Sequence, residues 1–255
     1  MTLDESRSID VWNRVLRKAL ALPGARINRA VFLEKELSKH FPQETVQKAI
    51  ESTPAKAGIP SSVIRSLARS SVAWHRVGVS SLSFLIGLPG GWWMTSAVPA
   101  DLGQFFWHVT VILQKLAYLH GWPEFFEEGG EPDDETLLLF TVFVGVMFGA
   151  GTASKVLGEL AERVGQQLVK RLPRKALTKW GLYRLAKQVA KWIGIKLTKK
   201  TFAGYLAKAI PIISGFISGT ISWVSFSVMS SRLIRHLERL NLSKPEENGQ
   251  RGSRD

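Results

Sequence analysis

Histidine, cysteine and clustered carboxylates are the side chains that most often perform catalysis or hold metals, and in this sequence they are absent or dispersed. The chain has no cysteine, which excludes disulfides, thiolate metal sites and cysteine nucleophiles. Its histidines lack the spacing of metal ligands: His40, His75, His108, His120 and His236. No P-loop, nucleophile elbow or zinc-protease motif occurs. We therefore expect no catalytic residue, no metal and no cofactor, and we interpret His108 as a hydrogen-bonded core residue.

The densest group of carboxylates lies in the segment EFFEEGGEPDDE, residues 124–135, which holds seven acidic residues and no basic one. Clustered carboxylates can bind Ca²⁺. An EF-hand loop, however, places its oxygen ligands at alternating positions and ends on a bidentate glutamate, and this segment does not. Runs of like charge are usually solvated. We interpret the segment as a solvated acidic loop.

Positive charge is concentrated in one part of the chain. The net charge is +13, and residues 155–200 contain thirteen Lys and Arg against two Glu, a surplus of eleven. On a helix through this part, one face is apolar: Leu182, Leu185, Val189, Trp192 and Ile193. The opposite face is basic: Arg184, Lys187 and Lys191. This pattern is typical of a helix lying on an anionic membrane, with tryptophan at the interface. An ordinary surface helix that packs its apolar face on the protein has the same pattern. The residues predicted to bind lipid are Lys179, Trp180, Arg184, Lys187, Lys191 and Trp192.

The elements that must position these residues are helices. Strand-like alternation is rare, and residues 9–22, 27–40 and 43–52 have helical periodicity. Three uncharged runs follow, over residues 77–100, 136–154 and 209–231. Each is close to the roughly 20 residues that cross a hydrocarbon core of about 30 Å. The sequence therefore predicts an all-α multi-helix bundle with apolar hairpins that are either buried or inserted into a membrane.

Turn and capping signals divide the first uncharged run. Its Pro-Gly-Gly triplet at residues 89–91 permits a chain reversal, which would form a hairpin with two short arms. Asp101 follows this run and precedes Gln104 by three residues, the spacing of a capping box. We expect Asp101 to be the N-cap of a helix over residues 102–119. The alternative is a catalytic or ligand-binding carboxylate.

Small residues recur at helical spacing in the second and third runs. Gly145 and Gly149, continued by Ala153, are four residues apart, and so are Gly215 and Gly219. Residues four apart share a helix face, and small ones let two backbones approach closely. We therefore predict close packing between these two helices. The competing interpretation is that the glycines relieve crowding in a soluble helical core.

Several motifs, in this order, resemble the EcsC family. They are the GLPGG motif (Gly87, Leu88, Pro89, Gly90, Gly91), the PADL motif containing Asp101, a helix ending in YLHG at residues 118–121, and KAIPIISG at residues 208–215. The resemblance covers roughly residues 60–230. It departs from the family pattern at Trp92 and Trp93, where smaller residues are usual, and at His120, where tyrosine is expected. The family takes its name from a gene neighbouring an ABC transporter, so the resemblance implies a membrane-associated helical protein and little chemistry.

These observations predict three regions: N-terminal amphipathic helices over residues 1–58, an EcsC-like helical domain over 59–240 and a disordered tail over 241–255. The N-terminal segment has no secretory signal, which favours a cytoplasmic, membrane-associated protein. We expect a non-enzymatic protein that docks on anionic lipid through its basic segment and packs or inserts its glycine-containing helices. Expected partners are anionic lipid, a membrane transporter or other membrane protein, and a second copy of the chain. The alternative is a soluble nucleic-acid-binding protein that uses residues 155–200.

Overall fold

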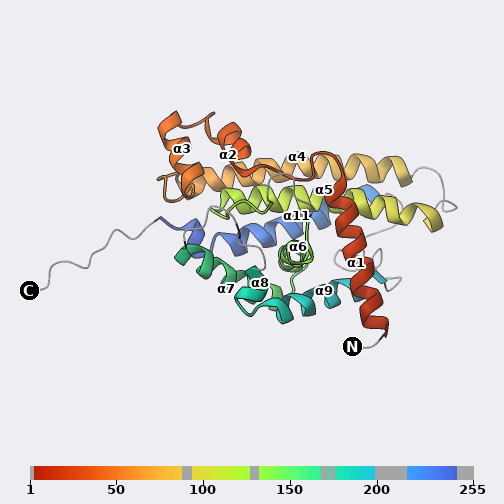
Figure 1. The fold of residues 1–255 in the computed structure, drawn as a ribbon. Coiled ribbons are helices and arrows are strands. Elements are labelled where there is room, and N and C mark those ends of the chain that lie inside the picture. The colour runs from red at the N-terminus through yellow and green to blue at the C-terminus, as the bar shows by residue number, and fades with distance from the viewer. Residues whose placement is uncertain are drawn as a thin grey trace, which may run out of the picture.

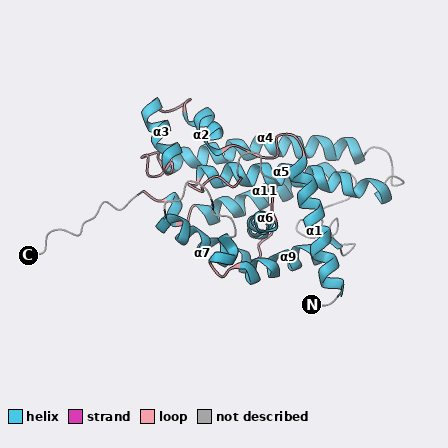
Figure 2. Cartoon of the chain, in the orientation of Figure 1, coloured by secondary structure: helices cyan, strands magenta, loops and turns pink. Residues whose placement is uncertain are grey.

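Every regular element is a helix in the part of the chain that the structure describes (Figures 1 and 2). The computed structural model describes residues 3–87, 94–126, 132–167, 172, 176–198 and 217–245. The α-helices are α1 (Leu3–Ala21), α2 (Arg29–Leu37), α3 (Gln43–Glu51), α4 (Ser61–Gly87), α5 (Met94–Leu119), α6 (Asp134–Met147), α7 (Gly151–Gln167), α8 (Ala176–Lys179), α9 (Tyr183–Thr198) and α11 (Ile217–Leu237); a short 3₁₀ helix, η1 (Asn241–Ser243), follows. The prediction of an all-α bundle is confirmed.

Helix α6 lies at the centre of the bundle, and Figure 1 looks along its axis. It contacts α1, α5, α7, α8, α9 and α11, and residues 137–147 are all buried. A helix that is apolar on every side needs such surroundings, because any exposed side would leave hydrophobic area in water. The part of the second uncharged run that forms α6 is therefore enclosed by protein. Of the helices in the described ranges, none combines the length and apolarity needed to cross a bilayer.

Specific residues define both ends of α6. At its start the Asp133 carboxylate accepts a hydrogen bond of 2.8 Å from the Thr136 backbone N–H, as an N-cap does. At its end Gly149 has φ +84°, and the backbone N–H of Ala150 donates to the Gly145 carbonyl at 2.8 Å. This is a Schellman motif, whose left-handed residue is usually glycine. Gly149 thus ends the helix and does not lie on its packing face, so the predicted stripe of Gly145, Gly149 and Ala153 on one helix is wrong.

Helices α4 and α5 form the predicted hairpin, but its arms are long (Figure 1). They contain 27 and 26 residues, because each helix extends well beyond the uncharged run. Helix α5 begins at Met94, so Asp101 lies in its interior and the N-cap prediction is wrong. An N-cap needs a non-helical backbone, and the seven residues before Asp101 are already helical. Helix α11 packs along α4 and completes this side of the bundle.

The N-terminal helices share the core of the later ones. Helix α1 packs against α5 and α9, and the Trp12 indole N–H donates to the Thr141 hydroxyl of α6 at 2.8 Å. Buried Gln114 of α5 holds the connection between α1 and α2, since its amide donates to the Ala25 carbonyl and accepts from the Ile27 N–H. Helices α1 and α2 are thus part of the same bundle as the later described helices.

The chain end beyond α11 also begins in contact with the bundle. Leu242 in η1 is 7% exposed, and the Ser243 hydroxyl donates to the Leu237 carbonyl at 2.8 Å. The predicted disordered tail is therefore wrong for residues 241–245, because Leu242 is an apolar anchor. Residues 246–255 lie outside the described part of the chain.

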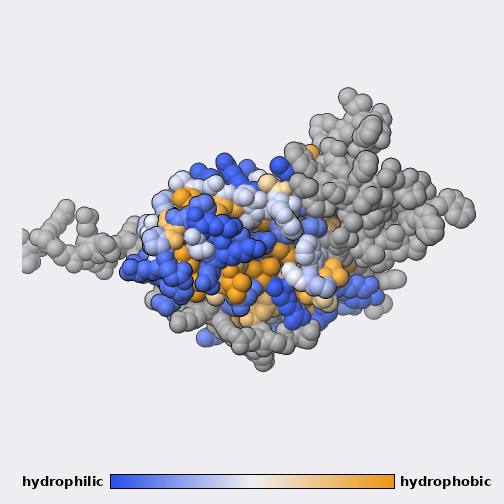
Figure 3. Space-filling model, turned by 90° about the horizontal axis from the view of Figure 1, so that it is seen from above, coloured by the Kyte–Doolittle hydropathy of each residue, from blue (hydrophilic) through white to orange (hydrophobic). Residues whose placement is uncertain are grey.

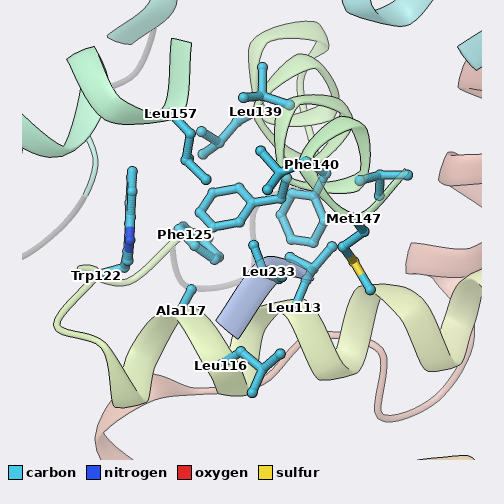
Figure 4. Close-up of a cluster of buried hydrophobic side chains, with 14 of the residues drawn as sticks. Leu113, Leu116, Ala117, Trp122, Phe125, Leu139, Phe140, Met147, Leu157 and Leu233 are labelled. Atoms are coloured by element: carbon cyan, nitrogen blue, oxygen red, sulfur yellow. The ribbon is translucent and has the colours of Figure 1, made fainter. Parts of the chain in front are cut away.

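Aromatic side chains fill the centre of the core. Figure 4 shows Phe125 and Phe140 between the leucines of α5 and those of α6, α7 and α11. The rings of Phe125 and Phe140 are 5.6 Å apart, and Trp122 lies 5.0 Å from Phe143, both with edge-to-face geometry. On the outside, the face that carries α2, α3 and α4 is mostly hydrophilic with a smaller hydrophobic area (Figure 3).

Candidate functional site

Helix α9 presents an apolar side to the core and a basic side to solvent. Its buried side consists of Ala186, Val189, Ala190 and Ile193, each at most 2% exposed. Arg184 and Lys187 on the other side are exposed. The Lys187 ammonium also lies 4.9 Å from the centre of the Tyr183 ring, one turn back on the helix. The two-sided pattern expected from the sequence is therefore present in the structure.

The apolar side of α9 is covered by other helices. It packs against α1 and α6, and Val189 lies directly over Gly145 of α6. This is the arrangement of an ordinary surface helix, one of the two interpretations left open by the sequence. Only the basic side of α9 therefore remains available for another molecule.

The predicted lipid-binding residues differ in accessibility. Lys179 of α8 is exposed, as are Arg184 and Lys187, while Lys191 is partly buried. Trp180 is only 7% exposed, so it lies in the core and not at the basic surface where the sequence placed it. Trp192 is partly buried against the core. We call Lys179, Arg184, Lys187 and Lys191 the α8–α9 basic surface, which lies on the opposite side of the bundle from α2 and α3 (Figure 1).

The acidic segment helps to fix this surface in place. The Glu135 carboxylate accepts from the Leu177 N–H at 3.0 Å and from the Thr178 N–H and hydroxyl, which ties α8 to the start of α6. Asp134 forms an ion pair of 2.7 Å with Arg17. Asp133 and Asp134 are exposed, as expected of a solvated acidic segment, but they lie at the start of α6 and not in a loop, and Glu135 is partly buried. Residues 127–131 lie outside the described part, and the described residues contain no group of metal-ligating side chains.

Gly145 is a close-packing position, but its partners differ from those predicted. A Cβ atom at this position would lie 2.5 Å from Val189 Cγ1 of α9 and 2.7 Å from Ala153 Cβ of α7. The sequence predicted that the glycine face of α6 would pack against the helix that is α11. Helix α11 does contact α6, but not at Gly145. Gly149 instead faces the Arg232 side chain of α11. Gly219 lies within α11, and Gly215 lies outside the described residues.

The resemblance motif falls at the closed end of the α4–α5 hairpin. Gly87 is the last residue of α4. Leu88, Pro89, Gly90 and Gly91 lie outside the described residues. Asp101 is inside α5, as given above. These residues therefore form no described site.

The structure brings together a buried pair of histidines that the sequence did not reveal. His75 Nδ1 of α4 lies 3.1 Å from His108 Nδ1 of α5, and the Lys115 ammonium lies 3.2 Å from His75 Nε2. Since the ammonium donates to Nε2, neutral His75 carries its proton on Nδ1 and donates to His108. Burial, the nearby Lys115 and then His108 lower the pKa of His75 to about 3, and burial lowers the pKa of His108 to about 4. His108 is thus a hydrogen-bonded core residue, as predicted.

Comparisons of the chain with protein-family models, with curated proteins and with solved structures gave no match. The site must therefore be judged from its own geometry. Three of the four cations of the α8–α9 basic surface are exposed, on two helices that pack against the bundle. Such a surface can attract and hold an anionic partner.

Proposed function

We propose that this protein docks on anionic membrane surfaces through the α8–α9 basic surface. The observation that supports this proposal is the geometry of α9, whose cations face outward while its apolar side is buried on α1 and α6. Docking is then electrostatic, with side chains reaching headgroups and no apolar face of α9 entering lipid. Each Lys or Arg near an anionic bilayer contributes about 1 kcal/mol, so the four residues contribute about 4 kcal/mol.

The distribution of charge supports the same proposal. Residues 155–200 carry a surplus of eleven positive charges, close to the net charge of +13 of the whole chain. The described cations of this segment include those of the α8–α9 basic surface. Concentrated positive charge attracts anionic surfaces, and the proposal places the α8–α9 basic surface against the membrane.

The α4–α5 helix pair is the second part of the proposal. Residues 77–100 are uncharged, and Figure 1 shows that α4 and α5 extend beyond the rest of the bundle on the side of α1. Uncharged helical segments can lie in the interfacial region of a bilayer without crossing it. The resemblance to the EcsC family stays a prediction, as does a membrane transporter as partner. Both agree with a position at the membrane surface.

The docking surface is tested by vesicle flotation. Full-length protein is mixed with phosphatidylcholine vesicles with or without phosphatidylserine, and R184Q/K187Q/K191Q is compared with the wild type. Loss of three cations, each contributing about 1 kcal/mol, is expected to weaken partitioning by about 100-fold. Wild-type protein that ignores phosphatidylserine would exclude the proposal.

A matched variant separates the surface from net charge alone. K35Q/R69Q/R239Q removes three exposed cations from other helices and connections, and we expect it to retain most of the binding. Equal loss in both variants would show that the α8–α9 basic surface has no special role. Duplex DNA at the same salt concentration tests the alternative, and tighter binding to DNA than to phosphatidylserine vesicles would favour nucleic acid.

A further inference from the structure

A cavity of about 800 Å³ is lined by residues of α3, of α7 and of the segments around them. Helices α3 and α7 lie at the same end of the bundle (Figure 1). Five segments line the cavity: the start of α2, residues around the α3–α4 connection, the turn after α5, the end of α7, and the residues of and after η1. Its size is within the range of small-molecule sites, about 300–1,000 Å³. None of the α8–α9 basic surface contributes to it.

The cavity has a positive lining. Arg29, Lys48, Lys56 and Lys244 line it, against Glu51 as the acidic residue. Lys48 and Lys244 are exposed and form no ion pair within the described residues. Exposed cations that converge on a hollow, as Lys48 and Lys244 do here, favour an anion inside it.

Arg29 supplies a buried positive charge to this lining. It is 7% exposed, and its guanidinium donates to the carbonyls of Ala49, Ile50, Ser52 and Trp122 at 2.5–3.1 Å. Glu124 accepts from the backbone N–H of Arg29 at 2.7 Å and not from its guanidinium. The guanidinium is thus hydrogen-bonded to carbonyl groups, with the Glu124 carboxylate nearby, and burial is the main cause that lowers the pKa of Arg29. An arginine remains protonated in proteins, so the cavity wall keeps this charge.

The segments around the cavity are closely packed against one another, so the cavity is preformed. Gly121 has φ +86°, and a Cβ there would lie 2.5 Å from the Leu242 carbonyl oxygen and 3.1 Å from Thr53 Cβ. The turn after α5, the α3–α4 connection and η1 are therefore in direct contact at this glycine. A preformed cavity binds a ligand with little ordering cost.

We propose that this cavity binds a small molecule bearing a phosphate group, with Lys48 and Lys244 contacting the phosphate and Arg29 providing the buried charge. Lysine is a common phosphate ligand, and a mixed polar and apolar wall leaves room for the rest of the molecule. The phosphate can belong to a soluble metabolite or to a phospholipid headgroup. The proposal goes beyond membrane docking and does not depend on it.

Isothermal titration calorimetry tests the site with glycerol 3-phosphate as probe and glycerol as the neutral control. Full-length wild type is expected to bind glycerol 3-phosphate and not glycerol. K48Q/K244Q, which changes two exposed side chains, is expected to weaken binding by about tenfold for each lysine, because charge-assisted hydrogen bonds are lost. K35Q/R69Q, with the same loss of charge elsewhere, and R184Q/K187Q/K191Q are expected to bind as the wild type does.

Vesicles containing phosphatidic acid distinguish the two sources of phosphate. Binding of glycerol 3-phosphate assigns a soluble ligand. If glycerol 3-phosphate does not bind, a preference for phosphatidic acid over phosphatidylserine vesicles that is lost in K48Q/K244Q and kept in R184Q/K187Q/K191Q assigns a headgroup. Binding to neither probe, or equal weakening in K48Q/K244Q and K35Q/R69Q, would overturn the proposal while leaving the docking surface untouched.

Discussion

Helices α6 and α9 pack against each other, yet their environments differ. Helix α6 is enclosed by six helices, and its ends are defined by an aspartate cap and a glycine turn. Helix α9 buries one side on α1 and α6 and exposes Arg184 and Lys187 on the other. Both helices contain apolar residues that are compatible with lipid contact. In the structure, each apolar side is in contact with protein.

The difference separates the parts of the molecule that maintain the fold from those that can meet a partner. Around α6 the side chains are closely packed and away from solvent, so a substitution that changes their volume or charge is expected to lower the free energy of unfolding. On the outward side of α9, side chains are solvated, so a change there is expected to affect binding more than folding. Three perturbations test this contrast.

Acid is expected to have the largest effect, through the buried His75–His108 pair between α4 and α5. Their native pKa values of about 3 and about 4 lie below the unfolded value of about 6.5, so the native state binds fewer protons. The stabilisation is therefore present above pH 6.5 and is lost as the pH falls toward 4. At pH 5 each histidine is expected to cost about 2 kcal/mol, or about 4 kcal/mol together, in the free energy of unfolding. Urea unfolding followed by tryptophan fluorescence at pH 7 and pH 5 measures this difference.

The variant H75Q/H108Q is the control for the acid effect. Glutamine cannot titrate, so the difference between pH 7 and pH 5 is expected to be smaller than in the wild type by about 4 kcal/mol, whatever the stability of the variant at pH 7. His120 and His236 also have lowered pKa values and are present in both proteins, so their contributions cancel. A wild-type stability that is the same at both pH values would contradict the buried pair.

Overpacking at Gly145 is the second perturbation. In G145L the new side chain begins 2.5 Å from Val189 Cγ1 and 2.7 Å from Ala153 Cβ, so α6 must separate from α7 and α9. We expect the free energy of unfolding to fall by about 3 kcal/mol, measured by urea denaturation at pH 7.

G158A is the matched control on α7. A Cβ at Gly158 has no neighbour within 4 Å, and the position is helical. Alanine there is expected to stabilise the protein by about 0.5–1 kcal/mol through helix propensity. Similar effects of the two substitutions would show that the contact of α6 with α7 and α9 is not tight.

The sequence predicted those features that depend on local periodicity. The buried side of α9, with Val189 and Ile193, follows from helical spacing, as does the existence of the helices themselves. Whether an apolar run meets lipid or protein does not follow from spacing, because both environments favour the same side chains. The run that forms α6 is enclosed by helices that are distant in sequence, and no local signal reports them.

The wrong predictions also failed because local spacing does not determine the backbone conformation or the contacts between distant segments. A spacing of four residues between Gly145 and Gly149 fits two structures: a stripe of small residues on one helix, or a helix that ends at the second glycine. Only the positive φ of Gly149 distinguishes the two structures, and the sequence does not report it. The Asp101 cap prediction failed because the helix begins earlier, before Pro99. His75 and His108 are 33 residues apart, so their contact required the geometry of the α4–α5 hairpin.

The smallest expected effect is on the outward side of α9, where Lys187 contacts the ring of Tyr183. A partly exposed cation–π contact contributes about 0.5–1 kcal/mol, so K187Q is expected to lower the free energy of unfolding by no more than this. A double-mutant cycle with Y183L isolates the pair, and R184Q, on the same side of the helix, is expected to leave stability within about 0.5 kcal/mol of the wild type. A loss of several kcal/mol in K187Q or R184Q would show that this side of α9 also supports the fold. The contrast with α6 would then fail, and vesicle binding by these variants could no longer be interpreted as docking.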